Sequence, residues 1–220
     1  MKEVVYTGIF SDIKEAAYLI IKRLFDIVAG LIGLIVLIPI TIIIKIVSMC
    51  HGDFNNIFLV QDRIGKDGKE FKFYKFRSMV PNADEVLFKM LEEDKEVAKE
   101  YKINKKLKND PRITKVGHFI RKTSIDELPQ LLNVLKGDMS LIGNRPYLPR
   151  EKEDMGKYYE DIIKTKPGIT GYWQVSGRSD VSFKERLKLE QYYSLHYGLR
   201  MDIKIFFKTF GAVFGHKGAE

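Results

Sequence analysis

The sequence has few of the residues that build disulfide or zinc scaffolds. It contains one cysteine, Cys50, which excludes an intramolecular disulfide framework. Its histidines are scattered and match no zinc-ligand spacing: His51, His118, His196 and His216. Internal repeats and low-complexity segments are also missing from the sequence, which excludes repeat architectures. The chain must therefore be held together by an ordinary hydrophobic core or by another apolar environment.

Acidic residues are fewer than basic residues in this sequence. The 37 Lys plus Arg outnumber the 29 Asp plus Glu, so the formal net charge over 220 residues is +8. The hydrophobic fraction of 45% excludes a largely disordered chain, and the length suits one compact domain or two small ones. A net positive charge favours an anionic partner, either nucleic acid, an anionic membrane surface or a phosphorylated small molecule.

Ionisable residues are almost absent from Leu24 to Ile44, where Asp26 is the only one. About 20 apolar residues are enough to span a bilayer as a helix. The run starts too late and is too long for a cleaved signal peptide. A buried helix of a soluble protein is the alternative, but nothing else in the chain could cover so apolar a segment. We therefore expect this run to insert into a membrane.

Pro39 interrupts the apolar run. It lacks an N–H and clashes with the carbonyl of Ile35, so it should kink or break a helix. The helix before it would be about 22 Å long, which is shorter than a hydrocarbon core of about 30 Å. Basic residues flank the run on both sides, namely Lys14, Lys22, Arg23 and Lys45, so both ends suit the same side. We predict a re-entrant helix hairpin broken at Pro39, with a kinked span as the alternative.

Segments on either side of the membrane run are predicted by local pattern. Residues 9–20 have apolar positions at helical spacing and predict an amphipathic helix on the bilayer surface. Phe58–Ile64 and Glu70–Arg77 are strand-like, and Asp67-Gly68 between them is a strong hairpin signal.

The remainder of the chain is predicted to be mainly helical. Residues 84–108 form a highly charged, solvent-facing helix or helix pair, and Phe183–His196 is a further helix. Leu199–Phe210 is an amphipathic helix with basic residues, which either meets anionic headgroups or faces the core. The fold class is α+β and mainly helical, divided into an amphipathic segment (1–21), a membrane hairpin (22–50) and a globular domain (51–220).

Asp126 and Glu127 are adjacent carboxylates with two readings. In the first, Ser124-x-x-Glu127 is a capping box, in which Glu127 only closes a helix start. In the second, Asp126 is itself the N-cap and Pro129 lies in the first turn, where proline is tolerated. An aspartate held ionised in this way could act as a nucleophile on phosphorus, beside Glu127 as a Mg²⁺ ligand. On pattern alone, capping or surface roles are the commoner ones.

The chain from about residue 22 to 208 resembles the bacterial sugar transferase family, the monotopic phosphoglycosyl transferases that act on polyprenyl phosphate. The matching motifs occur in order and at the expected spacing: Lys22-Arg23-Leu24-Phe25-Asp26, Gln61-Asp62-Arg63-Ile64-Gly65, Tyr74-Lys75-Phe76-Arg77-Ser78-Met79, Asp110-Pro111-Arg112-Ile113-Thr114, Arg121 to Leu131, Gly137-Asp138-Met139-Ser140-Leu141, Arg145-Pro146 and Pro167-Gly168-Ile169-Thr170-Gly171. Together they are far more specific than any one alone.

The resemblance implies a membrane hairpin broken at proline and a catalytic domain on the cytoplasmic face of the bacterial inner membrane. It implies that Asp126 is the nucleophile, that Glu127 binds Mg²⁺ and that Arg145 contacts the substrate phosphate. Arg112 and Arg121 would help to bind the diphosphate, although each could equally be a structural ion-pair partner. The partners implied are a UDP-sugar, polyprenyl (undecaprenyl) phosphate and membrane lipids, with a homodimer left open. The chain looks like the minimal form, without an N-terminal block of several membrane helices.

The chemistry implied is transfer of a sugar 1-phosphate from the UDP-sugar to polyprenyl phosphate with release of UMP. We hypothesise two steps through a sugar-phosphate held covalently on Asp126. Asp138 would support the site from behind, Trp173 would pack in the core and Arg178 would reach the nucleotide. Two rival classes, a nucleic-acid-binding protein and a non-catalytic membrane adaptor, explain fewer features, because the first leaves the apolar run unexplained and the second leaves the carboxylate pair unexplained.

Three positions depart from the family pattern. Ile38 stands where serine often precedes the proline, and Asn144 replaces a proline before Arg145, which predicts a less rigid loop. The segment Met49 to Phe54 replaces the usual Ser-Pro-Gly-Pro after the membrane helix. The sugar and the glycan pathway are not encoded in any one residue.

Overall fold

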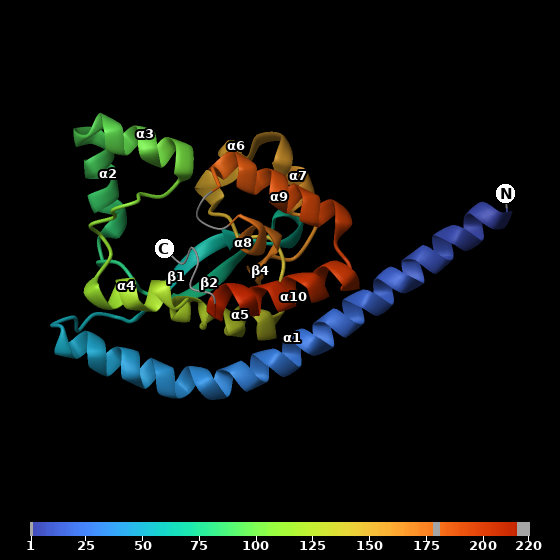
Figure 1. Ribbon diagram of the computed structural model, residues 1–220, viewed down its shortest axis with the longest axis horizontal. Coiled ribbons are helices and arrows are strands. Elements are labelled where there is room, and N and C mark those ends of the chain that lie inside the picture. Colours follow the sequence, from blue (N-terminus) through green and yellow to red (C-terminus); the bar gives the residue numbers. More distant parts are fainter. Residues whose placement is uncertain (1, 178–180, 215–220) are drawn as a thin grey trace.

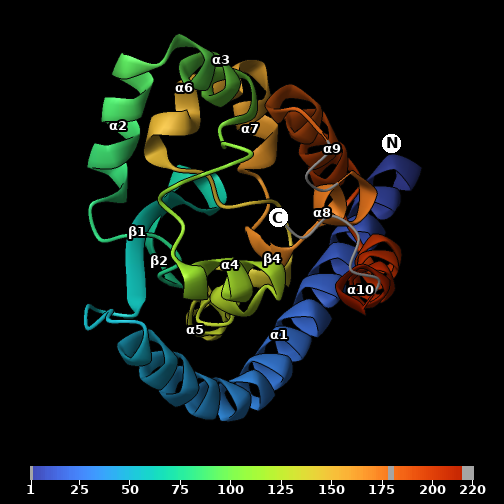
Figure 2. The same ribbon diagram turned by 60° about the vertical axis from the view of Figure 1, so that its left-hand side comes forward.

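A single long helix lies along one side of the globular part. In this computed structural model, which describes residues 2–177 and 181–214, α1 (Lys2–Cys50) is continuous over 49 residues and curves beneath the other elements (Figure 1). Figure 2 shows α4 (Lys115–Lys122) and α5 (Gln130–Lys136) lying on the inner side of this curve. The globular part is mainly helical, with two small two-stranded sheets.

Most of the apolar surface of α1 is not covered by protein. Among the described residues, it is the one helix that is long and apolar enough to cross a membrane, over Ile13–Cys50, and only 17% of its most apolar stretch is buried. Large side chains remain more than half exposed along it, including Leu31, Ile32, Ile35, Ile38, Ile42 and Ile43. Exposed apolar area of this extent is rare on soluble monomers, so the helix differs from a buried core helix.

The predicted helix break at Pro39 is not confirmed by the structure. α1 runs through Pro39 as one curved helix over Lys2–Cys50 (Figure 2), and the re-entrant hairpin stays a prediction. Proline removes only the bond to the carbonyl of Ile35, whereas Leu37 and Ile44, on either side of it, both pack into one core cluster with Phe76 and Ile120. This packing holds the helix together across the proline. The Thr41 hydroxyl donates to Leu37 O at 2.7 Å, a back-bond that accompanies bending.

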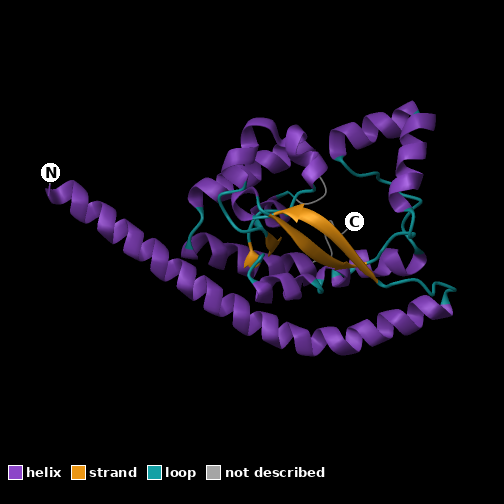
Figure 3. Ribbon diagram, turned by 180° about the vertical axis from the view of Figure 1, so that it is seen from behind, coloured by secondary structure: helices purple, strands orange, loops and turns teal. Residues whose placement is uncertain are grey.

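The predicted β-hairpin is confirmed. β1 (Phe58–Ile64) pairs antiparallel with β2 (Glu70–Phe76), so that Phe58 lies opposite Phe76. The turn η1 (Lys66–Gly68) places Asp67 at φ 56° and Gly68 at φ 75°, which is why an Asp-Gly pair occurs there. Seen from behind, this hairpin lies among the helices of the globular part (Figure 3).

The helical predictions also hold, with more elements than the sequence indicated. The charged stretch forms the pair α2 (Ala83–Glu93) and α3 (Lys95–Asn104), and α9 (Phe183–His196) has the predicted bounds. α10 (Leu199–Phe214) combines both predicted faces, because Ile205 is fully buried while Ile203 and Phe207 are exposed beside Lys204 and Lys208.

Short elements complete the globular part. The strands β3 (Ser140–Ile142) and β4 (Gly168–Thr170) pair in parallel. The remaining elements are η2 (Ile125–Glu127), η3 (Pro149–Glu151), α6 (Lys152–Met155), η4 (Gly156–Tyr158), α7 (Tyr159–Ile162) and α8 (Tyr172–Ser176).

Polar side chains near the start of the apolar run fasten α1 to the globular part. Asp26, 4% exposed, accepts hydrogen bonds from Ser140 Oγ at 3.0 Å and Leu141 N at 2.8 Å, both on β3. Arg23 donates to Val134 O at 2.5 Å and Leu135 O at 2.7 Å, where a cation also meets the negative end of α5. The family motif at residues 22–26 is therefore an anchor between α1 and the globular part.

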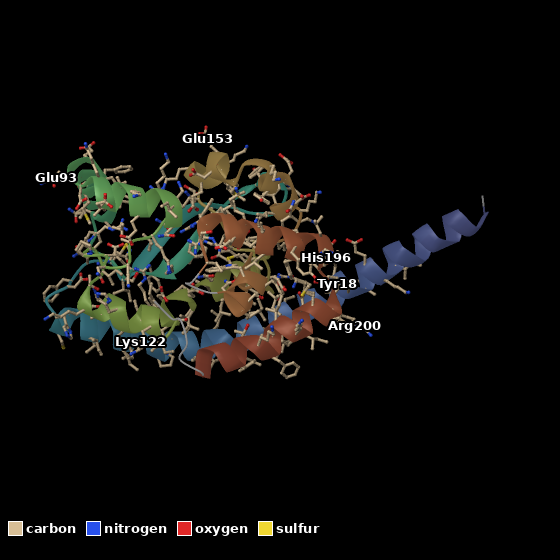
Figure 4. All side chains as sticks on the ribbon, turned by 45° about the horizontal axis from the view of Figure 1, so that its top comes forward. Tyr18, Glu93, Lys122, Glu153, His196 and Arg200 are labelled. Atoms are coloured by element: carbon tan, nitrogen blue, oxygen red, sulfur yellow. The ribbon has the colours of Figure 1, made fainter. Side chains whose placement is uncertain are left out.

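A buried carboxylate on α10 extends this anchor. Asp202 accepts from Tyr18 on α1 and from Tyr193 on α9, each at 2.8 Å, and pairs with Lys22 on α1. Figure 4 shows Tyr18 at the point where α1 passes α10. Three helices thus meet at one aspartate.

Two glycines let α5 approach α1 closely. A Cβ added at Gly30 would lie 2.8 Å from Leu135 Cδ2, and one at Gly33 would lie 2.4 Å from Leu131 Cδ1. Both distances are below van der Waals contact, so a larger residue at either position would require the facing leucine side chain to shift.

We expect the substitution Asp26→Leu to destabilise the protein by about 2–3 kcal/mol, because Ser140 Oγ and Leu141 N would lose their acceptor while buried. The matched change on the same helix is Thr41→Val, which removes one local hydroxyl bond and should cost less than about 0.5 kcal/mol. Thermal unfolding of both variants in detergent checks this. Equal stability of the two variants would contradict the anchoring role of Asp26.

Candidate active site

The adjacent carboxylates lie on the short turn η2 between α4 and α5. Ser124, just before the turn, has a left-handed backbone (φ 56°, ψ 16°) that residues other than glycine rarely adopt. Its side chain makes no capping bond, so the capping-box reading of Glu127 is excluded. Asp126 is not an N-cap either, because α5 begins at Gln130 with Pro129 as its cap. Both helix-start predictions are therefore wrong, and the turn itself sets the position of the pair.

Asp126 is paired with a lysine that the sequence analysis did not select. Lys75 Nζ on β2 lies 2.8 Å from Asp126 Oδ2, and the two side chains are 22% and 4% exposed. The other oxygen, Oδ1, makes no hydrogen bond or ion pair with the described residues. One oxygen of the carboxylate is therefore fixed by a cation, and the second is not committed to any group in the described part of the chain.

Glu127 lies beside the Lys75–Asp126 pair, but its carboxylate is not part of that ion pair. Its carboxylate makes no hydrogen bond or ion pair with the described residues. Burial raises its pKa, an effect opposed by Lys75 and reinforced by the negative charge of Asp126; Arg145 and Arg121 also oppose it. Glu127 is therefore close to three cationic side chains but is bonded to none of them.

The carboxylates fit a magnesium ion better than a protein-enclosed metal site. Within residues 2–177 and 181–214, no group of three or more His, Cys, Asp or Glu side chains could hold a metal. Mg²⁺ usually takes one or two carboxylates and fills its remaining positions with water and substrate phosphates. The unpaired Glu127 next to Asp126 supplies that donor set.

Arg145 lies on the loop Gly143–Leu148, which we call the Arg145 loop, between β3 and η3. It is close enough to lower the pKa of Glu127, and its Nε is buried without a hydrogen-bond partner. The neighbouring Asn144 donates to Ile162 O at 3.2 Å and Ser194 Oγ at 2.6 Å. The loop is therefore held by the amide of Asn144, and its lower rigidity stays a prediction.

The other predicted phosphate ligands differ in their surroundings. Arg121, in the last turn of α4, faces the pair closely enough to oppose the raised pKa of Glu127. Arg112 is 6% exposed and forms a fork with Asp110, with Nε–Oδ1 at 2.8 Å and Nη2–Oδ2 at 2.6 Å. The structure thus shows the ion-pair role for Arg112, and its phosphate contact stays a prediction.

Residues with secondary roles are placed as follows. The Trp173 ring lies under the guanidinium of Arg186 at 5.3 Å, and its Nε1 is buried without a partner. Asp138 accepts from Asn133 at 3.4 Å. Arg178 lies outside the described residues.

Two residues near the Arg145 loop were missed by the sequence analysis. Glu190 on α9 is 1% exposed, and it accepts from Arg145 N at 3.0 Å and from Tyr147 Oη at 2.5 Å. Burial raises the pKa of Glu190 to about 7, opposed by Arg186, by the bonds from Tyr147 and Arg145 N, and by Arg145. No local sequence pattern distinguishes Glu190 from a glutamate on the exposed face of a helix. Lys75, by contrast, stands in a motif that matches the family and could have been chosen from it.

Comparisons with known proteins agree over nearly the whole chain. The family described as bacterial sugar transferase matches residues 17–216. A protein of Erwinia amylovora named UDP-galactose-lipid carrier transferase is 43% identical over 217 residues, which cover 99% of this chain and 45% of that protein. Exopolysaccharide production protein ExoY of Sinorhizobium fredii is 39% identical over 199 residues, 90% of this chain and 87% of that protein.

A third relative has a name that states a full reaction. The UDP-glucose:undecaprenyl-phosphate glucose-1-phosphate transferase of Escherichia coli is 37% identical over 208 residues, 91% of this chain and 41% of that protein. The chain spans about half the length of the Erwinia and Escherichia relatives and most of the Sinorhizobium protein.

We expect Lys75→Met to cost about 1–3 kcal/mol of folding free energy, because it leaves the buried Asp126 without its cation. This cost is smaller than that of breaking a fully buried ion pair, because Lys75 is partly exposed to solvent. The matched control is Lys72→Met on the same strand, which breaks an exposed pair with Asp62 and should cost less than about 1 kcal/mol. Chemical denaturation in detergent measures both. A larger loss for the control would show that the Lys75–Asp126 pair contributes little to folding.

The raised pKa of Glu190 predicts a pH-dependent stability. A carboxyl group that binds its proton more tightly in the folded chain contributes stability below its unfolded pKa near 4.5, and this is lost as pH rises through about 7. From pH 5 to 8 the wild type should therefore lose on the order of 3 kcal/mol relative to Glu190→Gln. Glu185→Gln on the same helix should parallel the wild type, because the Ser182 cap lowers the pKa of Glu185 and keeps it ionised throughout. Parallel curves for all three proteins would refute the assignment.

Proposed function

Because this chain belongs to the bacterial sugar transferase family, we propose that it transfers a sugar 1-phosphate from a UDP-sugar to a polyprenyl phosphate, forming a polyprenyl-diphosphate sugar and UMP. This would be the first membrane step in assembling an exopolysaccharide, capsule or other glycan. The observation that carries the proposal is the Asp126 carboxylate, which is paired through one oxygen with Lys75 at 2.8 Å and sits beside the unpaired Glu127. The names of the relatives support it.

In the first step, Asp126 Oδ1 attacks the sugar-bearing phosphorus of the UDP-sugar. A bond forms between that oxygen and phosphorus, and the bond from phosphorus to the bridging oxygen breaks. UMP leaves with the electron pair, and the sugar phosphate remains as an acyl phosphate on Asp126. Lys75 holds Oδ2, so only one oxygen of the carboxylate is available and its direction is set.

In the second step, a phosphate oxygen of the polyprenyl phosphate attacks the same phosphorus. The bond to Asp126 breaks, the carboxylate is restored beside Lys75, and the sugar leaves as a polyprenyl diphosphate. Asp126 is the nucleophile in the first step and the leaving group in the second, and UMP departs before the acceptor reacts, so the kinetics would be ping-pong. Arg145 and Arg121, which both face Glu127, would balance phosphate charge in both steps.

Glu127, with Asp126 beside it, would hold Mg²⁺. When bound, the ion supplies positive charge to the diphosphate, which phosphoryl transfer needs for charge neutralisation. Substrate access is narrow, because the side chain of Asp126 is 4% exposed and Lys75 is the more open member of the pair. A bound diphosphate would therefore have to displace some of the side chains that shield Asp126 from solvent.

The long helix explains how the two substrates meet. A UDP-sugar is water-soluble, whereas the tail of a polyprenyl phosphate lies in lipid and its phosphate at the interface. We propose that the exposed apolar surface of α1 is embedded in the cytoplasmic membrane, with the globular part on the cytoplasmic face. Basic residues on α4 and α10, such as Lys122 and Arg200 in Figure 4, would face anionic headgroups.

Asp126→Asn should reduce UMP release at least about 1000-fold, because the amide is a poor nucleophile and cannot form the acyl phosphate. The measurement is UMP release by purified protein in membranes, with Mg²⁺, polyprenyl phosphate and a panel of UDP-sugars. Asp62→Asn is the control, since Asp62 forms the exposed pair with Lys72 and should leave turnover unchanged. Full activity of Asp126→Asn would overturn the nucleophile, and no UMP from any sugar with the wild type would overturn the proposed reaction.

A further inference from the structure

One buried carboxylate of the globular part has no role in the chemistry proposed above. Glu190 lies in the middle of α9, is 1% exposed, and uses both of its oxygens on the Arg145 loop. Placing a carboxylate in such a site is costly unless each oxygen is satisfied. Here one oxygen accepts from a backbone N–H and the other from a phenol, so the group is fully committed to residues 145–147.

The two bonds bracket a single peptide segment. Glu190 Oε1 receives Arg145 N at 3.0 Å, and Oε2 receives Tyr147 Oη at 2.5 Å, on either side of Pro146. Tyr147 is itself 2% exposed, and its pKa is raised well above the usual value by burial and by the charge of Glu190. The phenol is therefore a fixed donor, and it determines the direction of the carboxylate.

The same segment is also held by an arginine on β1. Arg63 Nη1 donates to Pro146 O at 3.0 Å, while its Nη2 donates to Gln61 Oε1 at 3.0 Å. Burial lowers the pKa of Arg63 to about 9, with further lowering by Arg145 and Arg150. Backbone atoms of residues 145 and 146 are thus clamped between a carboxylate and a guanidinium.

The side chain of Arg145 is left out of this clamp. Its Nε is buried without a partner, and its guanidinium makes no hydrogen bond or ion pair with the described residues. Its charge nevertheless acts on Glu127 at the candidate active site and on Glu190 behind it. A main chain held rigidly, with an uncommitted cation projecting from it, is the arrangement of a preorganised anion-binding group.

We propose that Glu190 is a positioning residue for Arg145: by fixing the backbone N–H of Arg145, it holds the guanidinium where it meets the diphosphate of the sugar donor. This inference rests on the proposed function, because it names the donor diphosphate as the ligand of Arg145. Glu190 touches no substrate. It acts through the peptide that carries Arg145, and the hydroxyl of Tyr147 keeps it in place.

The test compares two substitutions of similar volume. Glu190→Gln keeps an oxygen that can accept from Arg145 N, whereas Glu190→Leu has none. We expect Glu190→Leu to raise both the KM for the UDP-sugar and the Kd for UDP about 10-fold, the size expected for one lost hydrogen bond to a charged group. Glu190→Gln should stay within about 3-fold of the wild type. The KM for polyprenyl phosphate at saturating donor should change in neither variant.

The matched control is Glu151, another buried carboxylate that accepts from the backbone of the same loop. Its Oε2 receives Leu148 N at 2.8 Å, three residues beyond Arg145. Glu151→Leu is expected to lower the melting temperature without weakening UDP binding selectively. A purely structural role for Glu190 would give the same pattern as Glu151→Leu.

A second comparison covers the case in which Glu190→Leu does not fold. Tyr147→Phe removes the donor that orients Glu190, and Tyr158→Phe removes a phenol from the same core cluster without touching Glu190. We expect UDP binding to weaken about 3-fold in the first variant and to be unchanged in the second. Equal UDP affinity for Glu190→Leu and Glu190→Gln, or for the two tyrosine variants, overturns the inference. UMP release by the wild type, measured alongside, reports separately on the proposed function.

Discussion

The attachment of α1 to the globular part is the constraint on which the other features depend. A helix with a lipid-like surface has no affinity for a polar domain, so the two must be joined by polar groups placed within the helix. Asp26 supplies two acceptor bonds to β3, Arg23 caps the end of α5, and Lys22 reaches Asp202. These bonds are made where the helix is otherwise apolar, so they fix one register between α1 and the strands and helices above it.

The anchor and the candidate site are connected through α5. This short helix begins four residues after Asp126, and its last carbonyls accept from Arg23. α4, on the other side of the turn, packs through Ile120 into the cluster that contains Leu37 and Ile44 of α1. The turn that carries Asp126 and Glu127 is therefore held at both ends by elements seated on α1. Lys75 then fixes the carboxylate from the hairpin, so three separate parts of the chain define its position.

Local patterns predicted much of this fold, and they failed where tertiary packing decides. The hairpin, α9 and the α2–α3 pair follow from alternation, turn residues and helical spacing, all of which are properties of short segments. Pro39 was expected to kink or break the helix, but α1 continues through it, and core contacts on both sides of it outweigh one missing hydrogen bond. The helix-start readings at Ser124 and Asp126 failed because a left-handed Ser124 redirects the chain into a separate turn. The resemblance selected Asp126, Glu127 and Arg145 and contains Lys75 in one of its motifs, whereas Glu190 became visible only through a contact across a long sequence separation.

The glycines at positions 30 and 33 have a mechanical consequence. Because they allow Leu131 and Leu135 to pack directly on the backbone of α1, only these side chains of α5 separate the two helices there. This close packing, together with the bonds from Arg23, couples α5 to α1. If α1 tilts or sinks, the turn ahead of α5 is expected to move with it. With α1 embedded in a bilayer as proposed, the height of the Asp126 carboxylate above the hydrocarbon would depend on how deeply this one helix is inserted, and the thickness of the surrounding bilayer would become part of the geometry of the proposed site.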